Sequence, residues 1–233
     1  MNRLSQHLPL SGHRASLQRY LAEIVFSFDS VAGRIIEERM PVESARDPLR
    51  PSLVLWACDA NGGDPREALP VAAAFALFDR FMLLHDELAD DSAESIGRWG
   101  LGQTLNAGDA FYALAFRALA RDVGDPARRL EAARLVGQAV LEAIESRPGE
   151  AARDAAMTAA ALRAGALVAG ASPLVAAAYS RAGNLLGLAC AVDDPQEARR
   201  LTQEAVAALR RHTPSGDLAI FEEVAEYVAR HGA

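Results

Sequence analysis

Apolar residues recur three or four positions apart along nearly the whole chain, and this period restricts the fold more than any other feature of the sequence. In the segment 17–38 the apolar positions form one face of a helix. No segment alternates apolar and polar residues as a half-buried strand does. About a fifth of the 233 residues are alanine, the best helix former and a residue depleted in strands. The sequence therefore predicts an all-α fold.

Proline and glycine mark where helices begin and end. After the helix 17–38 we expect a loop at 40–49. The further helices are expected at 52–60, 65–89, 102–122, 125–146, 151–171, 173–192, 196–212 and 217–230. The segment 155–178 is so rich in alanine and glycine that helices there should approach closely.

No long linker or internal repeat separates these helices, which favours one single-domain helical bundle over residues 1–233. We divide it into an N-terminal helix and loop (1–47), a core (48–194) and C-terminal helices (195–233).

Charge and cysteine content exclude several classes of function. The 31 acidic and 24 basic residues give a formal net charge of -7, which argues against nucleic-acid binding. Every basic residue is arginine, so mechanisms that need a lysine, such as Schiff-base formation, are excluded. Cys58 and Cys190 lack metal-ligand spacing and are typical of small core residues in a reducing compartment. No apolar run reaches the roughly 18 residues of a membrane span, so we expect a cytoplasmic protein.

Four acidic residues follow the apolar segment that ends near residue 85. They are Asp86, Glu87, Asp90 and Asp91. On a helix, Asp86 and Asp90 share a face and repel each other, and acids at a helix C-terminus also oppose the helix dipole. A divalent cation would relieve both effects, and Mg²⁺ typically takes one or two carboxylates plus substrate phosphates. A solvated acidic helix end is the alternative that these residues leave open.

Several motifs occur together with this cluster in a characteristic order. They are the segments 49–55, 62–65, 106–110, 137–138, 165–171 and 186–189. In order and spacing the chain from about 48 to 194 resembles the trans-isoprenyl diphosphate synthases, the polyprenyl synthetase family, of which it would be a shortened and divergent member. The resemblance implies the isoprenoid synthase fold, an all-α bundle that is usually dimeric and has a deep cavity between two aspartate-rich helices.

The resemblance also implies roles for the acidic cluster. The family's first aspartate-rich motif stands here as 86–90, with Glu87 in place of one aspartate. By this resemblance Asp86, Glu87, Asp90 and Asp91 would hold Mg²⁺ together with the diphosphate of an allylic substrate. Asp86 and Asp90 would be the catalytic residues, because the cation polarises the diphosphate as a leaving group.

The same resemblance implies four substrate-binding residues. Arg50 and Arg153 would contact diphosphate groups. Phe81 and Met82 would lie at the floor of the prenyl cavity, where bulky side chains imply a short prenyl chain.

The acceptor site departs from the family pattern. Asp47 stands in place of a lysine that grips isopentenyl diphosphate, and Asp79 in place of a histidine. Because Asp47 replaces that lysine, Arg50 is the one base retained from the Gly-Lys-x-x-Arg motif. In a separate motif, Arg153 and Asp154 replace a Lys-Thr pair.

The second aspartate-rich motif is also altered, since it is represented by Asp193 and Asp194. Pro195 would break the helix that should carry its last acid, so we expect a helix-ending loop there.

Three functions remain open from the sequence. The first is a modulating or non-catalytic subunit that binds an allylic prenyl diphosphate and forms a homodimer, or a heterodimer with a full-length paralogue. The second is an active enzyme, either a short-chain prenyl diphosphate synthase or a terpene-synthase-like enzyme that ionises an allylic diphosphate. The third is an all-α interaction protein without a role in isoprenoid chemistry.

Overall fold

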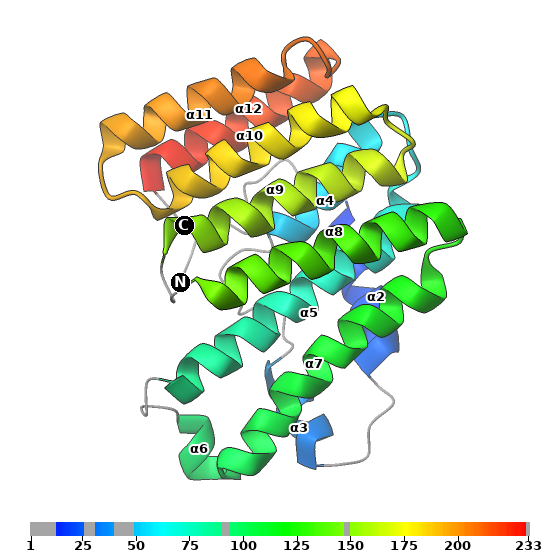
Figure 1. Cartoon of the computed structure of the whole chain (residues 1–233), viewed down its shortest axis with the longest axis vertical. Helices are drawn as coiled ribbons and strands as arrows, with labels where there is room; N and C mark the ends of the chain where they lie inside the picture. The colour runs from blue at the N-terminus through cyan, green and yellow to red at the C-terminus, as the bar shows by residue number, and fades with distance from the viewer. Residues whose placement is uncertain (1–12, 26–30, 40–48, 90–93, 147–149, 232–233) are drawn as a thin grey trace.

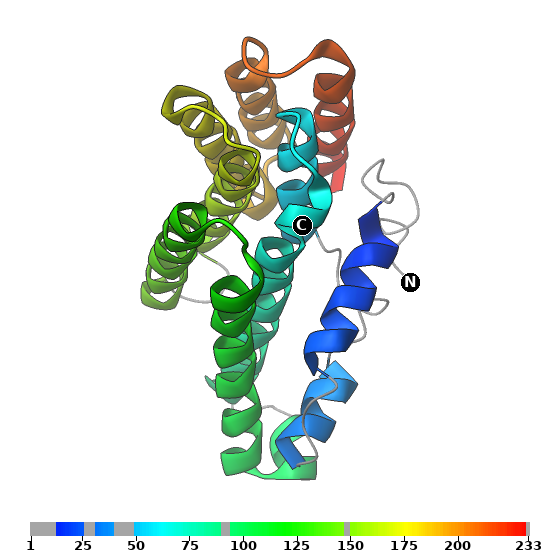
Figure 2. The same ribbon diagram turned by 90° about the vertical axis from the view of Figure 1, so that its right-hand side faces the viewer.

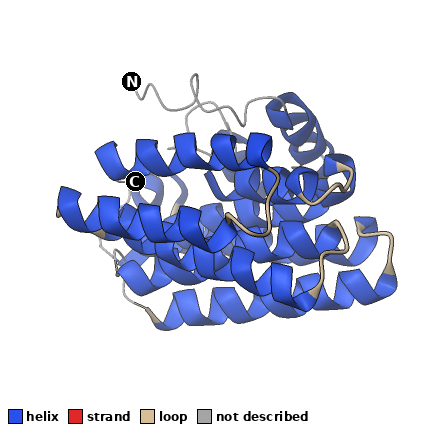
Figure 3. Cartoon of the chain, turned by 90° about the horizontal axis from the view of Figure 1, so that it is seen from above, coloured by secondary structure: helices blue, strands red, loops and turns tan. Residues whose placement is uncertain are grey.

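Helices make up almost all of the part of the chain that the computed structural model describes, which is residues 13–25, 31–39, 49–89, 94–146 and 150–231. Within these ranges there is no strand (Figure 3), as the periodicity predicts. The helices are α2 (Arg14–Val25), α3 (Val31–Arg39), α4 (Leu49–Ala60), α5 (Pro65–Ala89), α6 (Glu94–Trp99), α7 (Leu101–Asp122), α8 (Pro126–Glu145), α9 (Ala151–Val168), α10 (Pro173–Ala191), α11 (Pro195–Leu209) and α12 (Ser215–His231).

Two helices organise the packing. Helix α5 contacts α2, α4, α7, α8 and α9, and helix α9 contacts α4, α5, α8 and α10 (Figure 1). The C-terminal helices α10, α11 and α12 pack together at one end, and α2 and α3 form a layer on one side of α5 and α7 (Figure 2). Of the candidate site residues, Arg50, Asp86 and Arg153 lie where α4, α5 and α9 meet.

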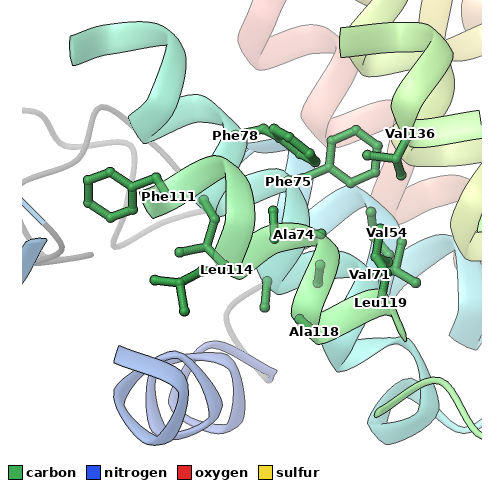
Figure 4. Close-up of a cluster of buried hydrophobic side chains, with 14 of the residues drawn as sticks. Val54, Val71, Ala74, Phe75, Phe78, Phe111, Leu114, Ala118, Leu119 and Val136 are labelled. Carbon is green, nitrogen blue, oxygen red and sulfur yellow. The ribbon is translucent and has the colours of Figure 1, made fainter. Parts of the chain in front are cut away.

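The buried apolar side chains form two clusters that meet at α4 and α9. The larger one joins α2 and α3 to α4, α5, α7, α8 and α9. In Figure 4 its aromatic centre is visible, with Phe75 of α5 beside Val136 of α8 and Phe78 next to Phe75. The smaller one joins α4 and α9 to α10, α11 and α12. Helices α4 and α9 are therefore buried from both sides.

Helix α10 lies unusually close to α9. A Cβ atom on Gly183 or Gly187 would overlap the backbone carbonyl oxygens of Thr158 and Asp154, respectively. A Cβ on Gly165 of α9 would likewise overlap the carbonyl oxygen of Val54 on α4. The close approach expected in the segment 155–178 is thus confirmed, and it brings the backbones of α4, α9 and α10 together behind the site.

Most helix boundaries lie within a few residues of those predicted, with two differences. The segment 17–38 contains two helices, α2 and α3, rather than one, and residues 26–30 between them lie outside the described part. The short helix α6 was not predicted, because six residues are too few to display a helical period. The predicted loop at 40–49 lies almost wholly outside the described residues.

Helices α5 and α10 are long and apolar enough to cross a membrane if length and composition alone are considered. Core helices pass the same test, and 67% of the apolar window of α5 is buried inside the bundle. In α10 the buried share is 39%. The expectation of no membrane span therefore stays a prediction.

Candidate functional site

The last turn of α5 carries Asp86 and Glu87, and each carboxylate binds an arginine from another helix. Arg153, in the first turn of α9, donates from Nη1 to Asp86 Oδ2 at 2.8 Å. Arg39, the last residue of α3, donates from Nη1 and Nη2 to the two oxygens of Glu87 at 3.0 and 2.9 Å. These guanidinium groups supply the positive charge that acids at a helix C-terminus require.

Asp90 and Asp91, the other two acids of the cluster, lie outside the described residues. Their predicted roles as catalytic residue and magnesium ligands therefore stay predictions. Within the described part, no group of three or more His, Cys, Asp or Glu side chains is arranged to hold a metal ion.

The donors that are present suit magnesium chemically, since Asp86 and Glu87 offer hard carboxylate oxygens in the last turn of one helix. Glu87 uses both of its oxygens to bind Arg39, so it would have to exchange that partner in order to bind a cation, whereas Arg153 contacts only Oδ2 of Asp86.

Arg50 binds two carboxylates from two different helices. It lies in the first turn of α4 and donates from Nη1 to Asp79 Oδ1 of α5 at 2.5 Å. Its Nη2 donates to Asp154 Oδ1 of α9. Burial by itself would lower the pKa of Arg50, but the two carboxylates raise it above its ordinary value. The guanidinium is therefore charged, and both of its terminal nitrogens are engaged by this Arg50–Asp79–Asp154 cluster.

The cluster links two replacements that are 75 residues apart in the chain. Asp79 stands where the family pattern has a histidine, and Asp154 where it has a threonine. Both carboxylates contact the guanidinium of Arg50, the one base retained from the acceptor motif. The cluster has a formal charge of -1, so it would repel an anionic ligand.

Phe81 and Met82 are both buried in α5, one turn before Asp86. The ring of Phe81 lies 4.4 Å from that of His85 and 5.4 Å from that of Tyr112 on α7, measured between centroids. Tyr112 also contacts Phe78, at 5.5 Å. The predicted floor of a prenyl cavity is thus part of an aromatic cluster between α5 and α7. The substrate-binding role of Phe81 and Met82 stays a prediction.

Asp194 caps a helix. Its carboxylate accepts a hydrogen bond from the backbone N–H of Gln196 at 2.9 Å, at the start of α11, and Pro195 is the first residue of that helix. This is a common N-terminal arrangement, because proline lacks the N–H that the first turn leaves unpaired. The expected break in the second aspartate-rich motif is confirmed.

Two arginines of this region were not singled out from the sequence. Arg39 ends α3, and Arg80 follows Asp79 in α5. For Arg80 a signal was present, since Asp79 and Arg80 interrupt an otherwise apolar run of α5. For Arg39 there was none, because its partner Glu87 is 48 residues away in the chain.

A comparison with known sequences shows which proteins the chain is similar to. No protein-family model matches the chain. A short chain isoprenyl diphosphate synthase from Methanothermobacter thermautotrophicus is 35% identical over 170 residues, which cover 63% of this chain and 52% of that protein. Over these residues the chain is similar to isoprenyl diphosphate synthases. It spans about half the length of the curated relatives it matches.

Solved structures show the same fold. A geranylgeranyl pyrophosphate synthetase from Geoglobus acetivorans superimposes with a TM-score of 0.85 at 16% identity, over 99% of this chain and 100% of that one. A geranyl diphosphate synthase small subunit from Antirrhinum majus gives 0.78 at 17% identity, over 97% and 100% of the two chains. The isoprenoid synthase fold that the sequence predicted is thus confirmed.

Proposed function

We propose that this protein is a modulating or non-catalytic subunit of the isoprenyl diphosphate synthase family that does not elongate prenyl chains by itself. The observation that carries the proposal is the Arg50–Asp79–Asp154 cluster. An isopentenyl diphosphate bound there would have to displace two carboxylates from Arg50 and would then face their negative charge.

The electrostatic cost of such binding is large. Each carboxylate near a diphosphate costs on the order of 1 kcal/mol or more at a surface-like dielectric constant, and the lost cation adds a similar amount. Together these effects amount to about 3 kcal/mol or more, which at about 1.4 kcal/mol per tenfold change in rate lowers chain elongation by about a hundredfold or more.

We further propose that the acidic cluster retains an allylic prenyl diphosphate. Family members are typically magnesium-dependent. In this proposal Asp86 and Glu87, with Asp90 and Asp91, hold Mg²⁺, which supplies positive charge to the diphosphate oxygens. Asp86 would exchange Arg153 for the cation. The released guanidinium would then bind the phosphate oxygens, for which its planar donors are suited.

The partner in this proposal is a full-length member of the same family. The Antirrhinum majus protein is by its name a small subunit, which supports a role of this kind. Helices α7 and α8 also present exposed large apolar side chains of the kind that protein interfaces cover. These are Leu101, Leu105 and Tyr112 on α7, and Leu130, Leu141 and Ile144 on α8.

The test is a condensation assay with radiolabelled isopentenyl diphosphate and allylic partners of five, ten and fifteen carbons. We expect no turnover by the purified protein alone. When a full-length paralogue is added, we expect a change in its rate or product length, together with a mixed species in size-exclusion chromatography. Robust turnover by the protein alone would show that the proposal is wrong. If the protein self-associates and forms no mixed species with the paralogue, the heterodimer in this proposal is wrong and the protein is a homodimer.

An active enzyme of another kind is the second candidate. The retention of Asp86 and Glu87 at the end of α5 favours it, since a pure scaffold has no need of acids that oppose the helix dipole. A terpene-synthase-like enzyme would ionise the allylic diphosphate without isopentenyl diphosphate. Release of free diphosphate from the allylic partner alone, abolished by Asp86→Ala, would support this candidate against the first.

A further inference from the structure

In the described part of the chain, four arginines lie around the C-terminal half of α5, and three of them are held by carboxylates. Arg39 binds Glu87, Arg50 binds Asp79 and Asp154, and Arg153 binds Asp86. The fourth is Arg80, on α5 itself. Across the described ranges, no hydrogen bond or ion pair joins its guanidinium to another residue.

The surroundings of Arg80 make this lack of a partner unfavourable. Its side chain is half-buried, and burial followed by the like charge of Arg39 lowers its pKa. The adjacent carboxylate of Asp79 raises that pKa but is already engaged by Arg50. A partly desolvated cation without a hydrogen-bonded counter-charge reduces the stability of the folded state.

The guanidinium of Arg80 is nevertheless within reach of a ligand. Some buried nitrogen atoms in the described residues are fully covered and lack a hydrogen-bond partner, and these belong to Arg50, Trp56 and Arg163. The side chain of Arg80 as a whole is only half-buried, so part of it reaches the surface. Glu87 lies seven residues further along α5 on the same face, and Arg39 is bound to it. Arg80 and the Arg39–Glu87 ion pair are thus neighbours next to the acidic turn.

We propose that Arg80 is an anion-binding residue that takes the oxygens of a diphosphate group, with Arg39 adding positive charge, beside the closed Arg50–Asp79–Asp154 cluster. The planar guanidinium donates two parallel hydrogen bonds to phosphate oxygens, and an anion removes the repulsion between Arg80 and Arg39. Among the four arginines, Arg80 accepts an anion without the loss of an ion pair. The choice of diphosphate rests on the proposed function, whereas the positive site itself does not.

The test is isothermal titration calorimetry with inorganic diphosphate in the presence of a chelator, so that no divalent cation contributes. We expect binding by the native protein, and an affinity at least tenfold lower for Arg80→Gln. The matched control is Arg117→Gln, which removes the same charge from an exposed position on α7. The affinity of Arg80→Lys for diphosphate should lie between those of the native protein and Arg80→Gln, since a lysine keeps the charge but loses the paired donors.

A stability measurement separates anion binding from a structural role. Without diphosphate, Arg80→Gln should melt at the native temperature or above it, because the substitution removes an unpaired and partly buried cation. It should also lose the rise in melting temperature that diphosphate causes in the native protein. A lower melting temperature for Arg80→Gln without ligand would assign Arg80 a structural role and overturn the proposal.

Two further outcomes would also overturn it. One is an unchanged affinity in Arg80→Gln, and the other is no binding of inorganic diphosphate by the native protein at millimolar concentration. A parallel titration with geranyl diphosphate identifies what Arg80 contacts. Equal losses for both ligands support recognition of the diphosphate group, and a loss confined to geranyl diphosphate contradicts it. Turnover in the condensation assay would refute the proposed subunit function but not the proposal about Arg80, because the titrations contain no isopentenyl diphosphate.

Discussion

Substitution of Arg50 by methionine should destabilise the protein strongly. Methionine keeps much of the length and apolar packing of the arginine stem but removes the guanidinium between Asp79 and Asp154. Two carboxylates from two helices then face each other without a counter-charge. The same contact joins α4 to both α5 and α9, so its loss acts on the centre of the bundle.

The size of the effect follows from the burial of the three side chains. Their exposed fractions are 21% for Arg50, 33% for Asp79 and 30% for Asp154. Removal of one partner from a fully buried ion pair costs about 3–5 kcal/mol, and residual solvent contact reduces this to about 2–4 kcal/mol. For a chain of this size, about 2–4 °C of melting temperature corresponds to 1 kcal/mol, so we expect a drop of roughly 5–15 °C.

The assay is thermal and urea unfolding of Arg50→Met against two references. The first is Arg66→Met, which breaks a hydrogen-bonded pair with Asp64 at the surface and should change the melting temperature little. The second is the double variant Asp79→Asn with Asp154→Asn, in which the guanidinium of Arg50 no longer faces a negatively charged carboxylate. Addition of Arg50→Met to that double variant should cost much less than in the native protein, because residues of one network are not additive.

The reasoning would be refuted if Arg50→Met were as stable as the native protein. It would be refuted equally if the cost of Arg50→Met were the same with and without the two aspartates. Either result would mean that the guanidinium is not engaged by Asp79 and Asp154, and the main support for an impaired acceptor site would be lost.

Two further predictions concern helix contacts. Gly187→Ala should lower the free energy of unfolding, measured in urea, by about 1–3 kcal/mol, because its Cβ would overlap the carbonyl oxygen of Asp154. Gly102→Ala is the control: it has open space around it and should stabilise α7 by about 0.5–1 kcal/mol. Equal effects of the two substitutions would contradict the close packing of α9 and α10. Asp194→Ala should cost about 1 kcal/mol through loss of the hydrogen bond to the Gln196 N–H, with no change in magnesium-dependent binding of a prenyl diphosphate analogue. A loss of that binding would restore Asp194 as part of the second aspartate-rich motif.

Most helices could be predicted because the signals that define them are local. Pro126, Pro173 and Pro195 each begin a helix, and the preceding Asp125, Ser172 or Asp194 accepts a backbone hydrogen bond within the first turn. These interactions span only three or four residues, so the sequence displays them directly. The division of 17–38 into α2 and α3 had no comparable signal, since the apolar period continues through both helices.

The candidate site was predicted less completely because its contacts join distant segments. Asp86 was singled out from its neighbours in the sequence, but its partner Arg153 is 67 residues away. Arg50 was expected to bind a substrate, and its contact with Asp154 spans 104 residues. Which charges meet depends on how α4, α5 and α9 pack, and a helical period does not specify that packing.

The sequence by itself determined the all-α class, the acidic end of α5 and the resemblance to isoprenyl diphosphate synthases, because helical period, capping and motif order are written in neighbouring residues. Only the tertiary structure decided that Asp79 and Asp154 converge on Arg50, that Arg153 neutralises Asp86, and that Arg80 has no carboxylate of its own among the described residues. The physical reason is that a charge acts through space. Its effect depends on which helices bring its neighbours within a few ångströms, whatever their distance along the chain.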